Sequence, residues 1–186
     1  MKKTAFAVIA ALFVCVIAVA GQTPVPPPVP GRAPAAQPPA NPTGNVLAEY
    51  MRPIKYDGLT LNVLLVNNRT VEVLFQAPTK YSMRARANQQ TVLYIQGTPS
   101  KDFNLTTAFT IEQDGETLTG KSTSIKNFVD GKVAPGQRID GIVEFPKKID
   151  ISKPFTVKNG TAGSVQFVLT ADAIKALAPA TVPGGR

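Results

Sequence analysis

Short stretches of alternating apolar and polar residues recur along this chain, and the clearest of them spans 138–145. Such alternation predicts a β-strand with one face on a core and the other in water, and Ile142 is the single apolar residue on the polar face. The core-facing residues are Ile139, Gly141, Val143 and Phe145. The strand is expected to end at Pro146, because a ring nitrogen donates no hydrogen bond.

The same alternation predicts the strands that pair with this one. They lie at 46–56, 60–66, 70–76, 81–87, 91–98, 106–113 and 164–170, with an exposed strand plus loop at 117–128 and a short segment at 155–158. Segments 60–66 and 70–76 form the strongest predicted hairpin. Segment 81–87 is expected to be half-buried with a basic solvent face, and 91–98, apolar on both faces, to be an interior strand. Pro53 places the first strand at a sheet edge.

Turn signals separate these segments. They are Asp57-Gly58, Asp114-Gly115, Pro135-Gly136 and Asn159-Gly160. Many short strands with such turns predict an all-β fold, an immunoglobulin-like antiparallel β-sandwich of about seven to nine strands. Only 171–177 indicates a helix, a short one with Thr170 as its N-cap.

The first twenty residues have the layout of a secretory signal peptide. Lys2-Lys3 precedes an apolar run that closes on Ala18-Val19-Ala20, a small-x-small cleavage site. The predicted location of the mature protein is therefore the periplasm or the cell exterior. An uncleaved anchor and a lipoprotein attached at Cys15 are the alternatives. The lipoprotein requires a small residue where Val14 stands, and the anchor requires a longer apolar run.

Residues 21–44 carry nine of the 17 prolines and are predicted to form a disordered, extended linker. The linker either holds the folded domain away from a membrane or wall, docks through Pro26-Pro27-Pro28 on an aromatic groove, or is a leader remnant without a role. Residues 45–172 are expected to form one sandwich domain, and 173–186 a C-terminal tail.

The composition narrows the chemistry. The chain has no histidine or tryptophan, and its single cysteine, Cys15, lies in the predicted leader. A mature domain of this kind contains no Ser-His-Asp or Cys-His arrangement and no His/Cys zinc site. We therefore expect no catalytic residues and no cofactor, and we predict that the protein is not an enzyme.

Carboxylates are the remaining candidates for acid–base or metal chemistry. Asp114 with Glu116 sits at a predicted hairpin tip, and Asp140 with Glu144 on the solvent face of one strand. A calcium site needs a dense set of oxygen ligands, and the loop carboxylates are too widely spaced for one. The loop carboxylates are Asp102, Asp114, Glu116 and Asp130.

The formal net charge of +8 favours anionic surroundings. Seven basic residues are candidates for binding an anionic partner such as an envelope polymer, lipid or acidic protein. They are Lys80, Arg84, Arg86, Lys147, Lys148, Lys153 and Lys158. Aromatic residues are not interleaved with them, which argues against nucleic acid. A scattered, solvated surface is the competing interpretation.

The order Val-Ala-Pro-Gly at 133–136, four residues, then Gly-Ile-Val-Glu-Phe-Pro at 141–146 resembles a bacterial exported family of unknown function. Members of that family are often lipoproteins or secreted antigens. The similarity covers about 109–169, and it implies an immunoglobulin-like fold and export. It supplies no catalytic residues to carry over.

These observations predict an exported, non-enzymatic module on a Pro-rich spacer that binds a protein or an anionic envelope component, with no membrane span after signal cleavage. Two alternatives stay open. One is a carboxylate-dependent hydrolase of an envelope polymer. The other is a structural subunit of a surface or secretion assembly, in which the edge near Pro53 pairs with a neighbour.

Overall fold

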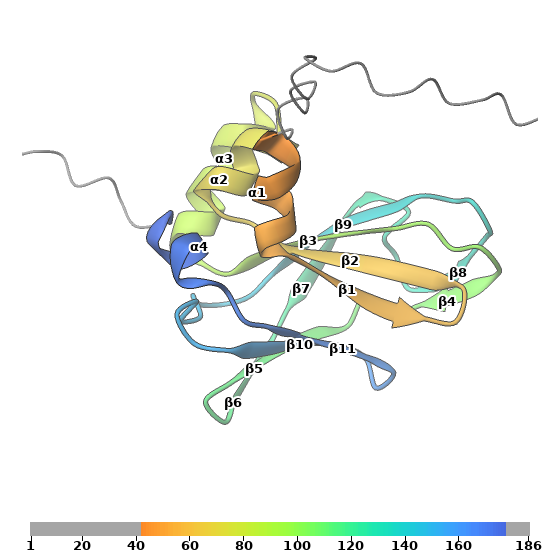
Figure 1. The fold of residues 1–186 in the computed structure, drawn as a ribbon. Helices are drawn as coiled ribbons and strands as arrows, with labels where there is room; N and C mark the ends of the chain where they lie inside the picture. Colours follow the sequence, from red (N-terminus) through yellow and green to blue (C-terminus); the bar gives the residue numbers. More distant parts are fainter. Residues whose placement is uncertain (1–41, 178–186) are drawn as a thin grey trace, which may run out of the picture. The chain divides into compact units, whose positions relative to one another are not determined.

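The computed structural model describes residues 42–177 (Figure 1). The predicted signal peptide at 1–20 with Cys15, the linker from 21 to 41, and the end of the tail at 178–186 lie outside the described residues.

Two antiparallel sheets make up most of the described chain. A five-stranded sheet has the order β1 (Met51–Tyr56), β2 (Leu59–Leu65), β3 (Val92–Gly97), β9 (Ile139–Glu144), β7 (Lys121–Lys126). A four-stranded sheet has the order β11 (Gly163–Phe167), β10 (Phe155–Asn159), β5 (Phe109–Gln113), β6 (Glu116–Thr119). A small ribbon pairs β4 (Phe103–Leu105) with β8 (Gly131–Val133). The predicted β-rich antiparallel architecture is confirmed.

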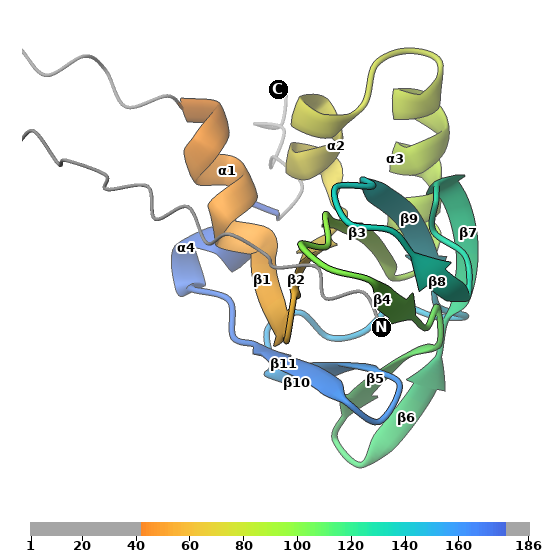
Figure 2. The same cartoon turned by 90° about the vertical axis from the view of Figure 1, so that its right-hand side faces the viewer.

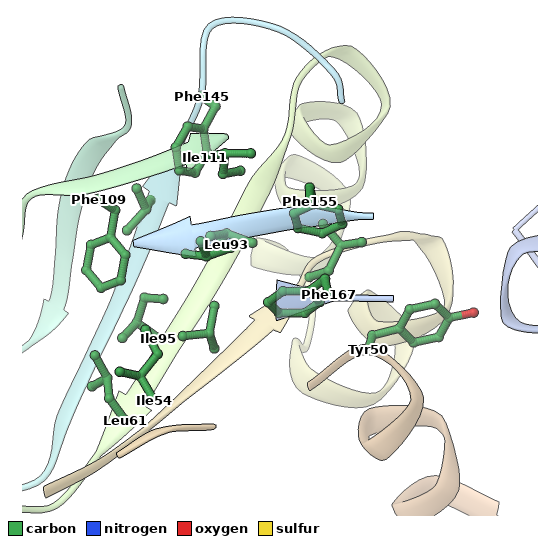
Figure 3. Close-up of a cluster of buried hydrophobic side chains, with 14 of the residues drawn as sticks. Tyr50, Ile54, Leu61, Leu93, Ile95, Phe109, Ile111, Phe145, Phe155 and Phe167 are labelled. Carbon is green, nitrogen blue, oxygen red and sulfur yellow. The ribbon is translucent and has the colours of Figure 1, made fainter. Parts of the chain in front are cut away.

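The two sheets share one hydrophobic core, to which both contribute large side chains (Figure 3). Ile95 and Val143 come from the five-stranded sheet, and Phe109 and Ile111 from the four-stranded one. The rings of Phe155 and Phe167 stack with centroids 4.8 Å apart. Two sheets that pack face to face over a shared core form a β-sandwich.

Two helices cover the other face of the five-stranded sheet: α2 (Asn68–Leu74) and α3 (Thr79–Gln89) (Figure 2). Beneath them lies a second apolar cluster, which consists of Val66, Val71, Met83, Ala87, Val92 and Ile142. The predicted strands at 70–76 and 81–87, and the hairpin built on the first, are therefore wrong. The sheet is part of three layers rather than two.

Local chemistry explains the first of these helices. The Asn67 side chain accepts hydrogen bonds from the backbone N–H of Arg69 and of Thr70, and the Thr70 hydroxyl accepts one from the Asn67 N–H. This reciprocal capping box starts α2 where a hairpin turn was expected.

The second helix has an apolar pattern that is ambiguous by itself. Met83 and Ala87, which are four residues apart, are buried, whereas Tyr81 and Ala85 on the same alternating parity are exposed. A spacing of four fits one face of a helix, and the residues between are good helix formers.

Strand β9 is buried on both faces, so the prediction of a half-buried strand is wrong. Ile139, Gly141 and Val143 face the shared core as expected. Ile142 packs into the second cluster and Asp140 is also buried, because helices and neighbouring strands cover the other face. Strand β3, which pairs with β2 and β9, is the interior strand that was predicted.

The N-terminal part of the domain begins with α1 (Pro42–Tyr50), so the first half of the predicted strand 46–56 is wrong and the second half is β1. The position of Pro53 in an edge strand is confirmed. Tyr50 is fully buried, and its hydroxyl donates to the Ala173 carbonyl at 2.8 Å. Ala173 lies in α4 (Ala171–Lys175), the predicted short helix, and Thr170 caps it.

The predicted strand 117–128 divides between the two sheets. Asp114 and Gly115 form the expected turn with φ of 51° and 80°, after which β6 runs along β5. The chain then crosses at Gly120 and continues as β7 beside β9. A Cβ at Gly120 would lie 2.4 Å from a methyl carbon of Val143, so the crossing needs glycine.

Candidate functional site

The seven basic residues predicted to bind an anionic partner lie in two groups. Lys80, Arg84 and Arg86 belong to α3, and the other four lie between β9 and the end of β10. In each group the structure adds acidic neighbours that are distant in sequence.

In the α3 group, Lys80 and Arg84 both pair with Glu72 of α2. Arg86 Nη1 lies 2.6 Å from Glu144 Oε1 on β9. Three cations therefore face two carboxylates, and most of the positive charge of α3 is compensated where it arises.

The second group surrounds the β5–β6 hairpin. Lys147 pairs with Glu116 at 2.6 Å, Lys153 with Asp114 at 2.8 Å, and Lys158 with Glu112 at 2.5 Å. The hydrogen bond to Asp114 raises the pKa of Lys153. Of the seven residues, Lys148 alone has no carboxylate within 4.0 Å in the described part of the chain. Binding of an anionic partner at these residues stays a prediction.

The two candidate carboxylate pairs are engaged in the same way. Asp114 and Glu116 each hold a lysine. Glu144 accepts from Arg86 and from Gln90. Asp140 and Glu144 are four residues apart in one strand, about 13 Å, which exceeds the separation of roughly 5 to 9.5 Å between paired carboxylates in glycosidases.

Asp140 is the centre of a polar cluster on the outer face of the five-stranded sheet. The Tyr94 hydroxyl donates to Asp140 Oδ1 at 2.7 Å, and Arg138 Nε and Nη2 each donate to the same oxygen at 3.2 Å. Burial, together with the hydrogen bond to Asp140, raises the pKa of Tyr94 to about 12. The buried carboxylate is thus satisfied by two neighbours that stay protonated at neutral pH.

Replacing Tyr94 with phenylalanine is expected to reduce the amount by which the free energy of unfolding falls at alkaline pH. The folded state holds the Tyr94 proton more tightly than the unfolded state, whose tyrosine pKa is about 10. This contribution to stability is complete below about pH 10 and is lost as the pH rises through 12. Urea unfolding of both proteins between about pH 8 and 11.5 checks it. Parallel curves across that range would show that Tyr94 contributes nothing.

One cavity of about 110 Å³ opens where α2 begins and α3 ends. Leu65, Ile149 and Leu177 give it apolar walls, and Asn88 and Lys148 stand at its polar side. Much of its remaining polar lining is committed, since Thr91 and Asn67 hydrogen-bond within the chain. The cavity therefore has few uncommitted groups to define a ligand.

Within residues 42–177 no three or more metal-ligating side chains come together. The loop carboxylates considered for calcium are engaged separately. Asp102 pairs with Lys132, and Asp130 accepts from the backbone and hydroxyl of Thr107. None of the helices in the same range is long and apolar enough to cross a membrane.

The free edge of the five-stranded sheet is β7, the outermost strand in Figure 2. Among the described strands it pairs only with β9. At the opposite edge β1 lies against β11, with Gly163 next to Ile54, and the Tyr56 hydroxyl donates to Oδ1 of Asn159, at the end of β10, at 2.7 Å. Among the described residues, the β1 edge is thus covered by a strand of the other sheet, whereas β7 pairs with β9 alone.

The side chains of β7 differ from those of the two basic groups. Lys121 and Lys126 are exposed and have no carboxylate within 4.0 Å among the described residues. Ile125 and, just beyond the strand, Val129 are 54% and 58% exposed. We call the outer side of Lys121–Lys126 the β7 edge; it joins uncompensated positive charge to exposed apolar surface.

No protein-family model, curated protein or solved structure matches the chain. The geometry of the described residues is therefore what bears on function.

The β7 edge was missed as a site because its sequence, KSTSIK, gives only a polar strand. The available signal was the pair of lysines flanking a strand with an apolar residue at a solvent position. Strand β7 lies at the edge because β9, its neighbour, is paired on its other side with β3. The paired residues of β3 and β9 are about 45 positions apart in the sequence, so no local pattern contains this information.

Proposed function

We propose that this domain is a non-enzymatic binding module that captures an extended segment of a partner protein along the β7 edge. The observation that carries the proposal is an edge strand that pairs on one side only and presents Ile125 to solvent. An extended segment added to such an edge gains main-chain hydrogen bonds, and side-chain contacts give specificity.

Other features of the chain fit this function. The signal peptide and the Pro-rich linker predicted from the sequence would export the domain and hold it away from an envelope surface. The predicted immunoglobulin-like family is compatible with the antiparallel sandwich and belongs to the same proposal. Compensation of most of the seven basic residues makes a protein segment a better partner than an anionic polymer.

The lysines and the irregular pairing of β7 also protect an edge from aggregation. Protection and binding are compatible, because lysine at an edge repels like-charged strands but not acidic ones. A purely protective edge, in contrast, would capture no segment at all.

The proposal is tested by selecting 12-residue segments from a displayed peptide library on the full chain. A photoreactive residue replaces Ile125 in one sample and Tyr81 in the control, since Tyr81 is also an exposed apolar side chain but lies on α3. We expect the selected segments to cross-link at position 125 and not at 81. Selection of no segment, or cross-linking at 81 alone, would refute the proposal.

A further inference from the structure

The β7 edge has a charge pattern that a partner strand must match. The pairing of β7 with β9 shifts between Ser124 and Lys126. Because of this bulge, Lys121, Thr123 and Lys126 pair with Glu144, Ile142 and Asp140, which share one face of β9. Both lysines therefore lie on the same face of the sheet, although five positions separate them in the sequence.

Strand β9 itself shows the pattern that suits this face. Its sequence Asp140-Gly-Ile-Val-Glu144 places a carboxylate opposite each lysine. Those carboxylates are taken by other groups, Asp140 by Arg138 and Tyr94 and Glu144 by Arg86 and Gln90. The charges of Lys121 and Lys126 stay available to a strand on their other side.

A second copy of this chain is a poor occupant of the edge. An antiparallel pair of β7 strands centred between Thr123 and Ser124 would place Lys121 opposite Lys126 at both ends. A parallel pair in register would place each lysine beside its own copy. Like charges opposite one another destabilise a pair of strands, so the edge disfavours self-pairing.

We infer that the segment bound by the β7 edge is acidic and carries two carboxylates four residues apart, as β9 does. This inference depends on the proposed function, because it specifies the partner of the same edge. Opposite charges across adjacent strands stabilise pairing, and two such pairs would select this spacing over others.

Three fluorescent peptides of equal length test the inference by anisotropy with the full chain. TEVTVET has two glutamates four apart, TEVTEVT has them three apart, and TKVTVKT has lysines instead. We expect TEVTVET to bind about tenfold more tightly than either of the others, and its affinity to fall as salt rises.

Matched variants locate the effect. Lys121→Gln with Lys126→Gln is expected to weaken binding of TEVTVET about tenfold. Lys55→Gln with Lys175→Gln removes two other exposed lysines that have no carboxylate within 4.0 Å among residues 42–177, and it should change nothing. Unchanged circular dichroism and melting temperature establish that each pair of substitutions leaves the fold intact.

The outcomes separate the inference from the proposed function. Equal binding of all three peptides, or loss of binding in both pairs of variants, overturns the inference. The proposed function still stands if selected segments cross-link at position 125. Absence of binding by TEVTVET overturns the inference as well. If, in addition, the selected segments do not cross-link at position 125, the inference and the proposed function are both overturned. A dimer that dissociates when Lys121 or Lys126 is replaced would also contradict the inference, because the occupant of the edge would then be a second copy of the chain.

Discussion

Replacing Gly141 with alanine is expected to lower the free energy of unfolding by about 3 kcal/mol. A Cβ at this position would lie 1.7 Å from Cδ1 and 2.2 Å from Cγ of Phe128. Phe128 is 2% exposed and packs into the shared core, so its ring has little room to move away. Urea unfolding followed by circular dichroism measures the change.

A double-mutant cycle provides the control. Phe128→Ala removes the ring that the added methyl group would meet, so Gly141→Ala should cost far less in that background. Equal costs of Gly141→Ala in the two backgrounds would mean that contact with Phe128 is not the cause. A cost below about 0.5 kcal/mol in the wild-type background would contradict the packing of β9 described here.

Replacing Phe167 with alanine is expected to destabilise the domain by about 3 to 5 kcal/mol. The ring is fully buried and stacks on Phe155, and the guanidinium of Arg52 lies 5.8 Å from its centroid. The Arg52 side chain also donates to the Val168 carbonyl, so it joins β1 to the end of β11. Truncation leaves a cavity and removes the surface on which Arg52 rests.

The neighbouring residue is the matched control. Val168 is 54% exposed, and its contact with Arg52 is made by its backbone carbonyl. Val168→Ala should therefore change the free energy of unfolding by no more than about 0.5 kcal/mol. Similar losses in the two variants would show that the end of β11 is not packed as described.

Strands that contribute to the shared core could be predicted from the sequence. Segments 60–66, 91–98 and 106–113 correspond to β2, β3 and β5, and the Asp114-Gly115 turn lies where it was expected. In these segments local propensity and tertiary burial agree, so a local pattern is sufficient.

The helical layer could not be predicted in the same way. In 81–87 Met83 and Ala87 fit a period of two and a spacing of four equally well, and only contact with Ile142 of β9 distinguishes the two. The capping box of Asn67 and Thr70 was readable locally, but the apolar alternation of 70–76 outweighed it. Without the helices, the outer face of β9 was assigned to water.

The candidate site was limited by the same lack of long-range information. The sequence identifies basic residues but not their neighbours, and Glu112, Asp114 and Glu116 meet lysines about 31 to 46 positions away. Lys121 and Lys126 attracted no attention in the sequence. They stand out because the fold places both on one edge strand and, in the described part of the chain, brings no carboxylate within 4.0 Å of either.

Residue-resolved amide hydrogen exchange on the full chain tests the central proposal, binding at the β7 edge, most directly. In the free protein, the β7 amides that do not donate to β9 should exchange rapidly, and TEVTVET should slow them while leaving β1 and β6 unchanged. Two results would contradict the account. One is that all β7 amides are already protected in the free protein, and the other is that the peptide slows exchange in another strand and not in β7.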